Sequence, residues 1–180
     1  MLGFFARHCR FVVGTSGGGW SKTGQNPTDR ARPGSKHHLA TDANGTPIAI
    51  ILTGANRNDV MQLLPLINAI PRISGLRGQP LSKPNRVYAD RGYGHDKCRK
   101  LLHAAAIPTS IARRGKPYGS GLDKVRWVVE RTHVWMHGFR RLRVRFERRA
   151  DIHEAFLRAH LLEHPSADSG VILKRLLVLN

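Results

Sequence analysis

Two carboxylates in this sequence have types and positions suited to metal-assisted chemistry. Asp90 ends the run Arg86-Val-Tyr-Ala-Asp90, which has the composition of a buried strand, and open α/β sheets bind ligands at the carboxyl ends of their strands. Glu130 lies in the middle of residues 122–139, the strongest helix candidate in the chain. Carboxylates that converge from two elements above a sheet can hold Mg²⁺ or Mn²⁺. A pair of such ions stabilises the attacking and leaving oxygens of phosphodiester chemistry.

Each carboxylate also has an ordinary structural interpretation. Asp90 can cap the turn that follows it or pair with Arg91. Glu130 belongs to a polar helix stripe that can face solvent, and the other members of this stripe are Arg126, His133 and His137. The two histidines have the i, i+4 spacing of some zinc sites, but no glutamate follows the first of them, so the sequence does not predict zinc.

A third group is the segment from Phe139 to Arg149, which contains six arginines, one glutamate and no lysine. Arginine binds phosphate in a bidentate manner, so this composition favours phosphate recognition over simple solubility. The candidates for DNA contact in this segment are Arg140, Arg141, Arg143 and Arg145. A solvated surface is the ordinary alternative, and RNA is an equally good partner on charge alone.

Composition bounds the class of protein. The 180 residues carry 30 Lys and Arg against 12 Asp and Glu, a formal net charge of +18 with a pI of about 11.4, which indicates a polyanionic partner. The length and the 41% of hydrophobic residues suit one globular domain. No apolar stretch reaches the roughly 18 residues of a membrane span, so a membrane protein is excluded.

The amino terminus and the cysteines favour a cytoplasmic location. Arg7, His8 and Arg10 interrupt the apolar start before it reaches the length of a signal peptide. Cys9 and Cys98 are too few for a disulfide framework, and they indicate ordinary thiols in a reducing compartment.

The hydrophobic pattern predicts an α/β order of elements. Residues 14–36 are rich in Gly, Pro, Ser and Thr and predict a loop. Strands are expected at 38–42, 47–53, 86–90 and 107–112, and helices at 58–70, 96–106, 122–139 and from 151 onward. The first two strands form an antiparallel hairpin around Asn44-Gly45. The last two are parallel, because a helix connects them.

Several ordered motifs match one protein family. They are Asn26-Pro-Thr-Asp-Arg30, Asp42-Ala-Asn-Gly-Thr-Pro47, Tyr88-Ala-Asp-Arg-Gly-Tyr93, Arg126-Trp-Val-Val-Glu-Arg-Thr132 and Phe139-Arg-Arg-Leu-Arg-Val-Arg145. The chain resembles the bacterial insertion-sequence transposases with a DDE catalytic triad, of the insertion-sequence-five-like group. The resemblance implies an RNase H-like mixed sheet flanked by helices. It also implies double-stranded DNA as the partner, both transposon ends and target, and a homodimer. The implied location is the bacterial cytoplasm, in association with the nucleoid.

The resemblance assigns roles residue by residue. The second acid of the triad corresponds to Asp90 and the final glutamate to Glu130, and both would be catalytic residues and metal ligands. Arg126 precedes the glutamate in the family motif, and His137 takes the place of a basic residue seven positions after it, so both are DNA-binding candidates. The implied cofactor is a pair of Mg²⁺ or Mn²⁺ ions. The implied reaction is hydrolysis at the transposon end followed by strand transfer.

The start of the chain departs from the family pattern. No acid precedes Asp29, so the first aspartate of the triad is missing. Either Gly14 stands in its place or a shifted reading frame has replaced the start, and Asp42 or Asp29 are alternative substitutes. The fold is therefore expected to be incomplete at its first strand. The expected divisions are a divergent start at 1–21, a partial catalytic domain at 22–163 and a divergent tail at 164–180, without the family's helical amino-terminal DNA-binding domain.

These observations lead to a functional hypothesis with alternatives. The chain is expected to be a truncated transposase that binds DNA and performs little or no strand transfer. A non-catalytic basic protein that keeps only the nucleic-acid-binding scaffold is the first alternative. A small ribosomal or RNA-associated protein is the second, and it would be expected to lack the motifs that carry Asp90 and Glu130.

Overall fold

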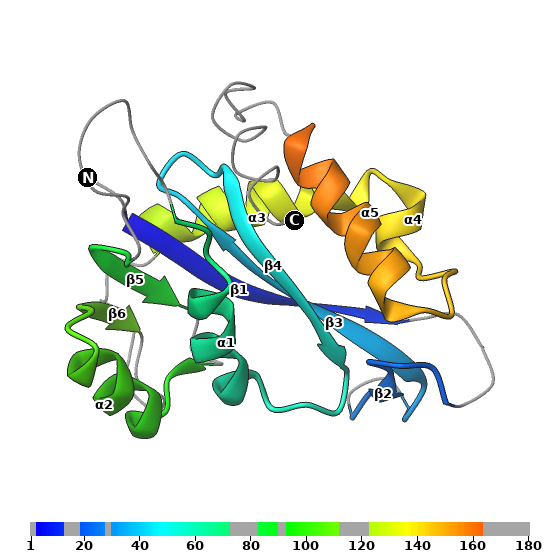
Figure 1. The fold of residues 1–180 in the computed structure, drawn as a ribbon, viewed down its shortest axis with the longest axis horizontal. Helices are drawn as coiled ribbons and strands as arrows, with labels where there is room; N and C mark the ends of the chain where they lie inside the picture. Colours follow the sequence, from blue (N-terminus) through cyan, green and yellow to red (C-terminus); the bar gives the residue numbers. More distant parts are fainter. Residues whose placement is uncertain are drawn as a thin grey trace.

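The protein is described by a computed structural model, which covers residues 3–12, 19–27, 30–72, 83–89, 93–111 and 123–163. One sheet forms its centre (Figure 1). The strands are β1 (Gly3–Val12), β2 (Gly24–Gln25), β3 (Pro33–Thr41), β4 (Pro47–Gly54), β5 (Arg86–Ala89) and β6 (Thr109–Ile111). Their order is β2-β3-β1-β5-β6, and β4 also pairs with β3.

The first strand is present, in contrast to the expectation of an incomplete sheet. β1 has ten residues and pairs along its length with β3, from Phe5 opposite Thr41 to Val12 opposite Gly34. It also pairs in parallel with β5. The apolar and β-branched residues that resembled the start of a signal peptide therefore form the central strand of the sheet.

The sheet is mixed in direction. β3 runs antiparallel to β1 and β4, whereas β1, β5 and β6 are parallel to one another. The predicted hairpin between β3 and β4 and the predicted parallel pair of β5 and β6 are confirmed. The predicted loop at 14–36 is shorter than expected, since β3 already begins at Pro33 and β2 pairs with it.

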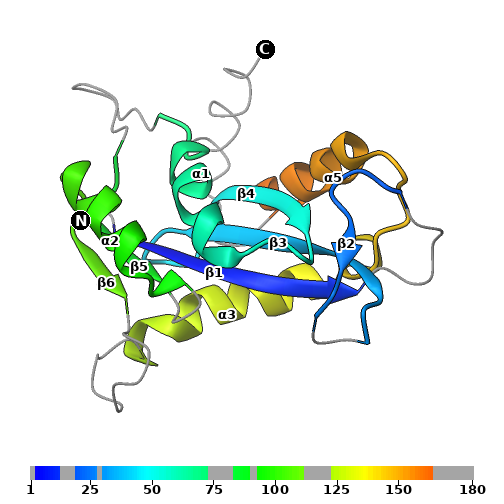
Figure 2. The same ribbon diagram turned by 90° about the horizontal axis from the view of Figure 1, so that it is seen from below.

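The two faces of the sheet carry separate cores. In β3, Leu39 packs in a cluster with Val129 and Met136, while Ala40 packs in the other cluster, with Leu66 and Leu102. Neighbouring strand residues point to opposite faces, which explains this alternation. Figure 2 shows the result: α1 lies on one side of the sheet and α3 on the other.

Two short helices cover the first face. A 3₁₀ turn (η1, Asp59–Gln62) begins where the Asn58 side chain accepts a hydrogen bond from Val60 N, and α1 (Leu63–Asn68) follows it. Pro65 falls in the first turn of α1, where a missing N–H costs little, so it fits the helix. Next along the chain, α2 (Asp96–Ala104) is capped by His95, and it confirms the predicted helix at this place.

Three helices lie in the described residues 123–163. They are α3 (Asp123–His137), α4 (Arg140–Arg143) and α5 (Ala150–Leu162). The helices α3 and α5 confirm the sequence prediction. The single turn of α4 was not predicted, because three of its four residues are arginines and show no apolar period. Within the residues that the structure describes, no helix is long and apolar enough to span a membrane.

Candidate active site and nucleic-acid interface

Glu130 lies on a side of α3 that is turned partly toward the protein. Val128, Val129, Thr132 and Met136 are buried, and Glu130 is half-buried. The next member of its stripe, His133, is only 4% exposed. The solvent-facing side of α3 is a different one, marked by Trp127 at 52% and Val134 at 72% exposure. The interpretation of the Glu130 stripe as a solvated surface is therefore wrong.

The β3–β4 hairpin fixes α3 along its axis. Arg131 Nη2 donates to Asn44 O at 2.7 Å, and Thr132 Oγ1 donates to Gly45 O at 2.7 Å. Gly45 has a φ of +88°, and a Cβ there would lie 3.1 Å from Arg131 Nη2 and 3.2 Å from Val128 Cγ1. The sequence indicated a tight turn at this glycine, but it gave no signal that the turn holds the helix that carries Glu130.

The carboxyl-terminal part of α3 lies near β3. His133 and His137 are close enough for their charges to disfavour protonation of His37 in β3, and their own rings meet edge to face at 6.1 Å between centroids. Burial lowers the pKa of His137, and the positive charge of Arg143 lowers it further. The Glu130 stripe therefore runs along the sheet, since α3 packs against β1 and β3.

Of the other predicted acids, Asp90 and Asp29 lie outside the described residues. Asp42 is described, and its Oδ1 accepts hydrogen bonds from Asn44 N at 2.9 Å and Thr46 N at 2.8 Å. These two bonds make it the acid that closes the hairpin turn. Asp42 is thus engaged in the turn, in contrast to the suggestion that it substitutes for the missing acid.

The described residues do not fit a site for two metal ions. β1 contains no acid along its ten residues, and Glu130 is the only acid in α3 between Lys124 and His137. Among the residues placed by the structure, no group of three or more His, Cys, Asp or Glu side chains could hold a metal ion. Mg²⁺ and Mn²⁺ are bound through oxygen ligands, chiefly carboxylates. The described residues alone therefore do not supply the carboxylates that a pair of these ions requires, and Asp90 lies outside them.

Three of the predicted DNA-binding arginines are exposed on α4. Arg140, Arg141 and Arg143 all face solvent. The guanidinium of Arg140 lies 5.7 Å from the Phe146 ring centre, and that of Arg141 lies 4.8 Å from the Phe156 ring centre. Arg141 Nη1 also lies 4.0 Å from Glu147 Oε1, and both guanidinium groups remain accessible to a phosphate from the solvent side. The backbone of Arg126 lies in α3, and its side chain is outside the description.

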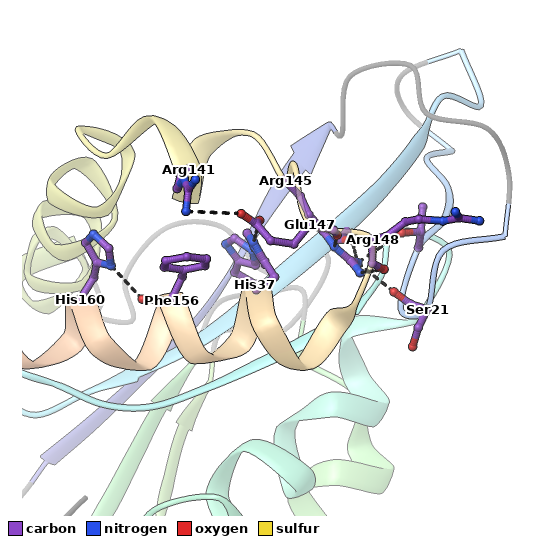
Figure 3. A network of polar contacts seen from close by, with 11 residues as sticks. Ser21, His37, Arg141, Arg145, Glu147, Arg148, Phe156 and His160 are labelled. Atoms are coloured by element: carbon purple, nitrogen blue, oxygen red, sulfur yellow. Dashed lines mark hydrogen bonds and ion pairs between the residues drawn. The ribbon is translucent and has the colours of Figure 1, made fainter.

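Arg145 differs from these three, because it is buried at 4% exposure. Its Nη1 donates to Ser21 O at 2.8 Å and Ser35 Oγ at 3.1 Å, and its Nη2 donates to Arg148 O at 3.0 Å (Figure 3). Its Nε donates to Glu147 O at 2.9 Å. The structure therefore corrects the prediction of a DNA contact: Arg145 joins the loop before β2, strand β3 and the segment before α5.

Arg145 and its partners form a corner beside α4 and α5. A chain of polar groups continues from this corner into the interior. His153 Nδ1 lies 3.2 Å from Glu147 Oε2, and His153 Nε2 lies 3.1 Å from His37 Nε2. Since a carboxylate only accepts, His153 donates from Nδ1 and its neutral ring accepts at Nε2 from His37. Burial lowers the pKa of both histidines, and the nearby charge of His153 lowers that of His37 further. The sequence gave no signal for this pairing, because the two histidines are far apart in the chain.

Comparison with known proteins identifies the family. A family model described as "Transposase DDE domain" matches residues 5–162. The chain belongs to the DDE-domain transposases. The match begins within β1 and ends at the last residue of α5, so it includes the whole sheet and all three helices of the second face.

Two relatives of this DDE transposase chain come from bacteria. One is "Putative transposase for insertion sequence element IS402" from Burkholderia cepacia, 66% identical over 149 residues, which are 83% of this chain and 71% of the relative. The other is "Transposase for insertion sequence element IS1106" from Neisseria meningitidis serogroup B, 30% identical over 114 residues, which are 58% of this chain and 36% of the relative. Both names confirm the resemblance to insertion-sequence transposases.

Membership in the DDE transposases establishes the general setting of the site. Proteins of this family act on DNA in transposition and generally use divalent metal ions. The mixed α/β fold is consistent with such a domain.

Proposed function

We propose that this chain is an insertion-sequence transposase domain that binds double-stranded DNA through its exposed arginines and performs little or no strand transfer. The family supplies the general function, DNA transposition. The observation that carries the second half of the proposal is the composition of β1: the central strand of the sheet has no acid. A catalytic site that needs a carboxylate from this strand is therefore incomplete.

The fold proposed for this domain is RNase H-like. Its support is the strand arrangement: an antiparallel set of β4, β3 and β1 is extended by β5 and β6, both parallel to β1. A long helix, α3, lies across one face of the sheet and carries Glu130. This arrangement provides the acid-bearing strand end and the acid-bearing helix that the proposal needs.

Asp90 and Glu130 are the acids that we propose for the remaining site. In β5, Tyr88 packs with the α3-side core, whereas Val87 and Ala89 pack with the other core. Asp90 follows Ala89 in the sequence, and we propose it because the resemblance assigns the second acid of the triad to it. The chemistry of two acids without a third would leave divalent ions poorly held.

DNA binding does not depend on this site. The +18 net charge and the exposed Arg140, Arg141 and Arg143 favour a phosphate backbone as ligand. Binding through phosphate contacts is expected without a divalent ion and with little sequence preference. We include Arg126 and His137, which precede and follow Glu130 in the sequence of α3, as further DNA contacts. A homodimer and association with the nucleoid stay predictions from the sequence.

The test is the salt dependence of binding to a duplex that carries the ends of the insertion sequence. Each phosphate contact contributes about −0.9 to the slope of log K against log salt. Replacing Arg140, Arg141 and Arg143 together by alanine should reduce the slope by about 2 to 3. The control replaces three exposed arginines elsewhere, Arg32, Arg57 and Arg72, and removes the same charge.

The control separates a local contact from general attraction. If the α4 arginines bind phosphate, their variant loses more of the slope than the control variant. An equal loss in both variants would contradict the proposed interface. Binding that requires Mg²⁺ would contradict the proposal that DNA binding is independent of the acidic site.

A further inference from the structure

We infer that a basic pocket between α2 and β6 is a second phosphate-binding surface for double-stranded DNA, separate from the arginines of α4. The inference rests on the proposed function for DNA as the ligand, and it adds a place where another stretch of duplex binds. The residues that line this α2–β6 pocket are Arg99, Lys100, His103, Ala104, Ile107 and Thr109.

The pocket has a volume of about 380 Å³ and lies where the later turns of α2 face the first residue of β6. Its helical members recur three and four residues apart, so they belong to one side of α2. That side presents a guanidinium, an ammonium and an imidazole, and Thr109 adds a hydroxyl from the strand. Arginine and lysine are the side chains that most often bind phosphate, through charge-assisted hydrogen bonds.

The fold holds one of these cations in place. Arg99 Nη2 donates to Ile111 O at 2.8 Å, which joins α2 to β6 at the pocket. A side chain that the fold has already ordered loses less conformational entropy when it binds a ligand. Arg99 is therefore a pre-ordered cation, and the exposed Lys100 beside it is free to adjust to a phosphate.

Positive charge exceeds negative charge around the pocket. In the described residues 83–89 and 93–111, Asp96 is the only acid, against five lysines and arginines. Its Oδ1 lies 3.7 Å from Arg99 Nε, which is too far for a hydrogen bond, and its side chain is 80% exposed. Such exposed ion pairs are weak. Lys83 adds a further cation, since its Nζ donates to Ala105 O at 3.3 Å, at the end of α2.

The pocket and α4 lie on opposite faces of the sheet and at opposite ends of it. Leu102 of α2 packs in the core of the first face, whereas Leu142 of α4 packs in the core of the second. α2 contacts β6, the last strand in the described order, while α5, the neighbour of α4, contacts β4, which pairs with β3 (Figure 1). A single flat interface does not include both places, so each contacts its own stretch of DNA.

Duplex DNA fits the spread of cations at this end of the sheet. It carries one negative charge per roughly 1.7 Å of its axis, so several phosphates come within reach of neighbouring cations at once. Lys83, Arg99 and Lys100 come from two segments and provide such a set. The family to which the chain belongs acts on DNA.

The test compares Lys100→Ala with Lys97→Ala in binding to a fluorescent DNA duplex over a range of salt concentrations. Both lysines are exposed on α2 and both changes remove one charge, but only Lys100 lines the pocket. Lys100→Ala should reduce the slope of log K against log salt by about 1, and Lys97→Ala should leave the slope nearly unchanged. Urea unfolding confirms that both variants are folded.

A second measurement repeats the comparison in the chain that carries alanine at Arg140, Arg141 and Arg143. Effects at independent sites add, so Lys100→Ala should again reduce the slope by about 1. No further loss in this background, or no remaining DNA binding to measure, would overturn the inference, because α4 would then carry the whole interface.

The outcomes separate the inference from the proposed function. Equal losses in Lys97→Ala and Lys100→Ala would overturn the inference, and so would a loss that occurs with duplex RNA of the same length but not with DNA. In either case, a slope reduced by the α4 variant beyond its own control would still support the proposed function. If the α4 variant instead equals its control, the proposed interface fails, and a specific loss in Lys100→Ala still supports the pocket.

Discussion

Two regions on the same face of the sheet differ in the polar side chains that they bring together. At the corner of α4 and α5, Arg145 donates to several acceptors, and Glu147, His153 and His37 form a continuous chain. Along α3 and β1, the acid Glu130 belongs to a helix that packs against β1, and β1 has no acid of its own. The first region joins distant segments through polar side chains, whereas in the second β1 adds no carboxylate to Glu130.

This difference implies that folding and DNA binding are separable from catalysis in this chain. The corner connects residues that are distant in sequence, from Ser21 to His153, and of the α4 arginines Arg141 reaches it through an ion pair with Glu147 at 4.0 Å (Figure 3). Damage to the corner should unfold the protein. Changes in the α3–β1 region should leave the fold and the affinity for DNA largely unchanged.

The largest expected effect is at Arg145. Replacing Arg145 by alanine removes a buried cation and leaves the carbonyls of Ser21, Glu147 and Arg148 without their donor. Hydrogen bonds to charged groups contribute about 1.5 to 3 kcal/mol each, so the free energy of unfolding should fall by about 3 kcal/mol or more. Urea unfolding measures this change. Arg143→Ala, at an exposed position, should change stability by less than about 0.5 kcal/mol. Similar values for both variants would contradict the distinction between the two kinds of arginine.

The second effect is a loss of stability in acid. The pKa values of His37 and His153 are lower in the folded chain than the ordinary 6.5, chiefly because of burial. As the pH falls below 6.5, the unfolded chain takes up protons first, so the stability present above this pH declines toward the folded-state pKa. The decline is at most about 1.4 kcal/mol per pH unit for each histidine.

Urea unfolding between pH 7.5 and 5 tests the acid effect. His37→Gln, which keeps a donor for His153, should show a weaker dependence on pH than the unchanged chain. The control is His103→Gln, at an exposed position in α2. If the control flattens the pH profile as much as His37→Gln does, the buried chain of histidines is not its cause.

The third effect is at the hairpin that holds α3. Gly45→Ala forces a side chain into a left-handed conformation and against Arg131 and Val128, so a loss of about 1 to 2 kcal/mol is expected. Gly19 also has a positive φ, +108°, but a Cβ there would meet nothing within 4 Å. Gly19→Ala therefore measures the backbone strain alone. Thermal unfolding measures the stability of both variants. An equal loss of stability in Gly45→Ala and Gly19→Ala would show that the contact of Gly45 with α3 adds nothing.

The smallest effect is at single arginines of α4. Arg140→Ala should reduce the slope of log K against log salt by about 1 and leave the unfolding free energy nearly unchanged. Filter binding or fluorescence anisotropy over a range of salt concentrations measures the slope. An unchanged slope together with lost stability would mean that Arg140 serves the fold, as Arg145 does.

Much of the fold could be predicted from the sequence because its signals are local. Asn44-Gly45 predicted the hairpin, and the apolar period of 122–139 predicted α3. β1 was missed, since Arg7, His8 and Arg10 made its residues look like an interrupted apolar leader. Such charges are compatible with a strand whose polar and apolar residues are distributed over two faces.

The candidate site could be predicted less well, because contacts between distant residues decide it. Glu130 was found from its helix and from the family motif, and its half-buried position is compatible with the proposed role. Arg145 was grouped with its neighbours, because a run of arginines gives no sign of which one turns inward.

The measurement that tests the central claim most directly is nicking of a duplex with the ends of the insertion sequence by the unchanged chain, in Mn²⁺ and in EDTA at matched ionic strength. The account predicts the same salt-sensitive binding in both buffers and no nicking above background in either. Nicking that requires Mn²⁺ and disappears in Glu130→Ala would contradict it, because the chain would then hold a working metal site without an acid in β1.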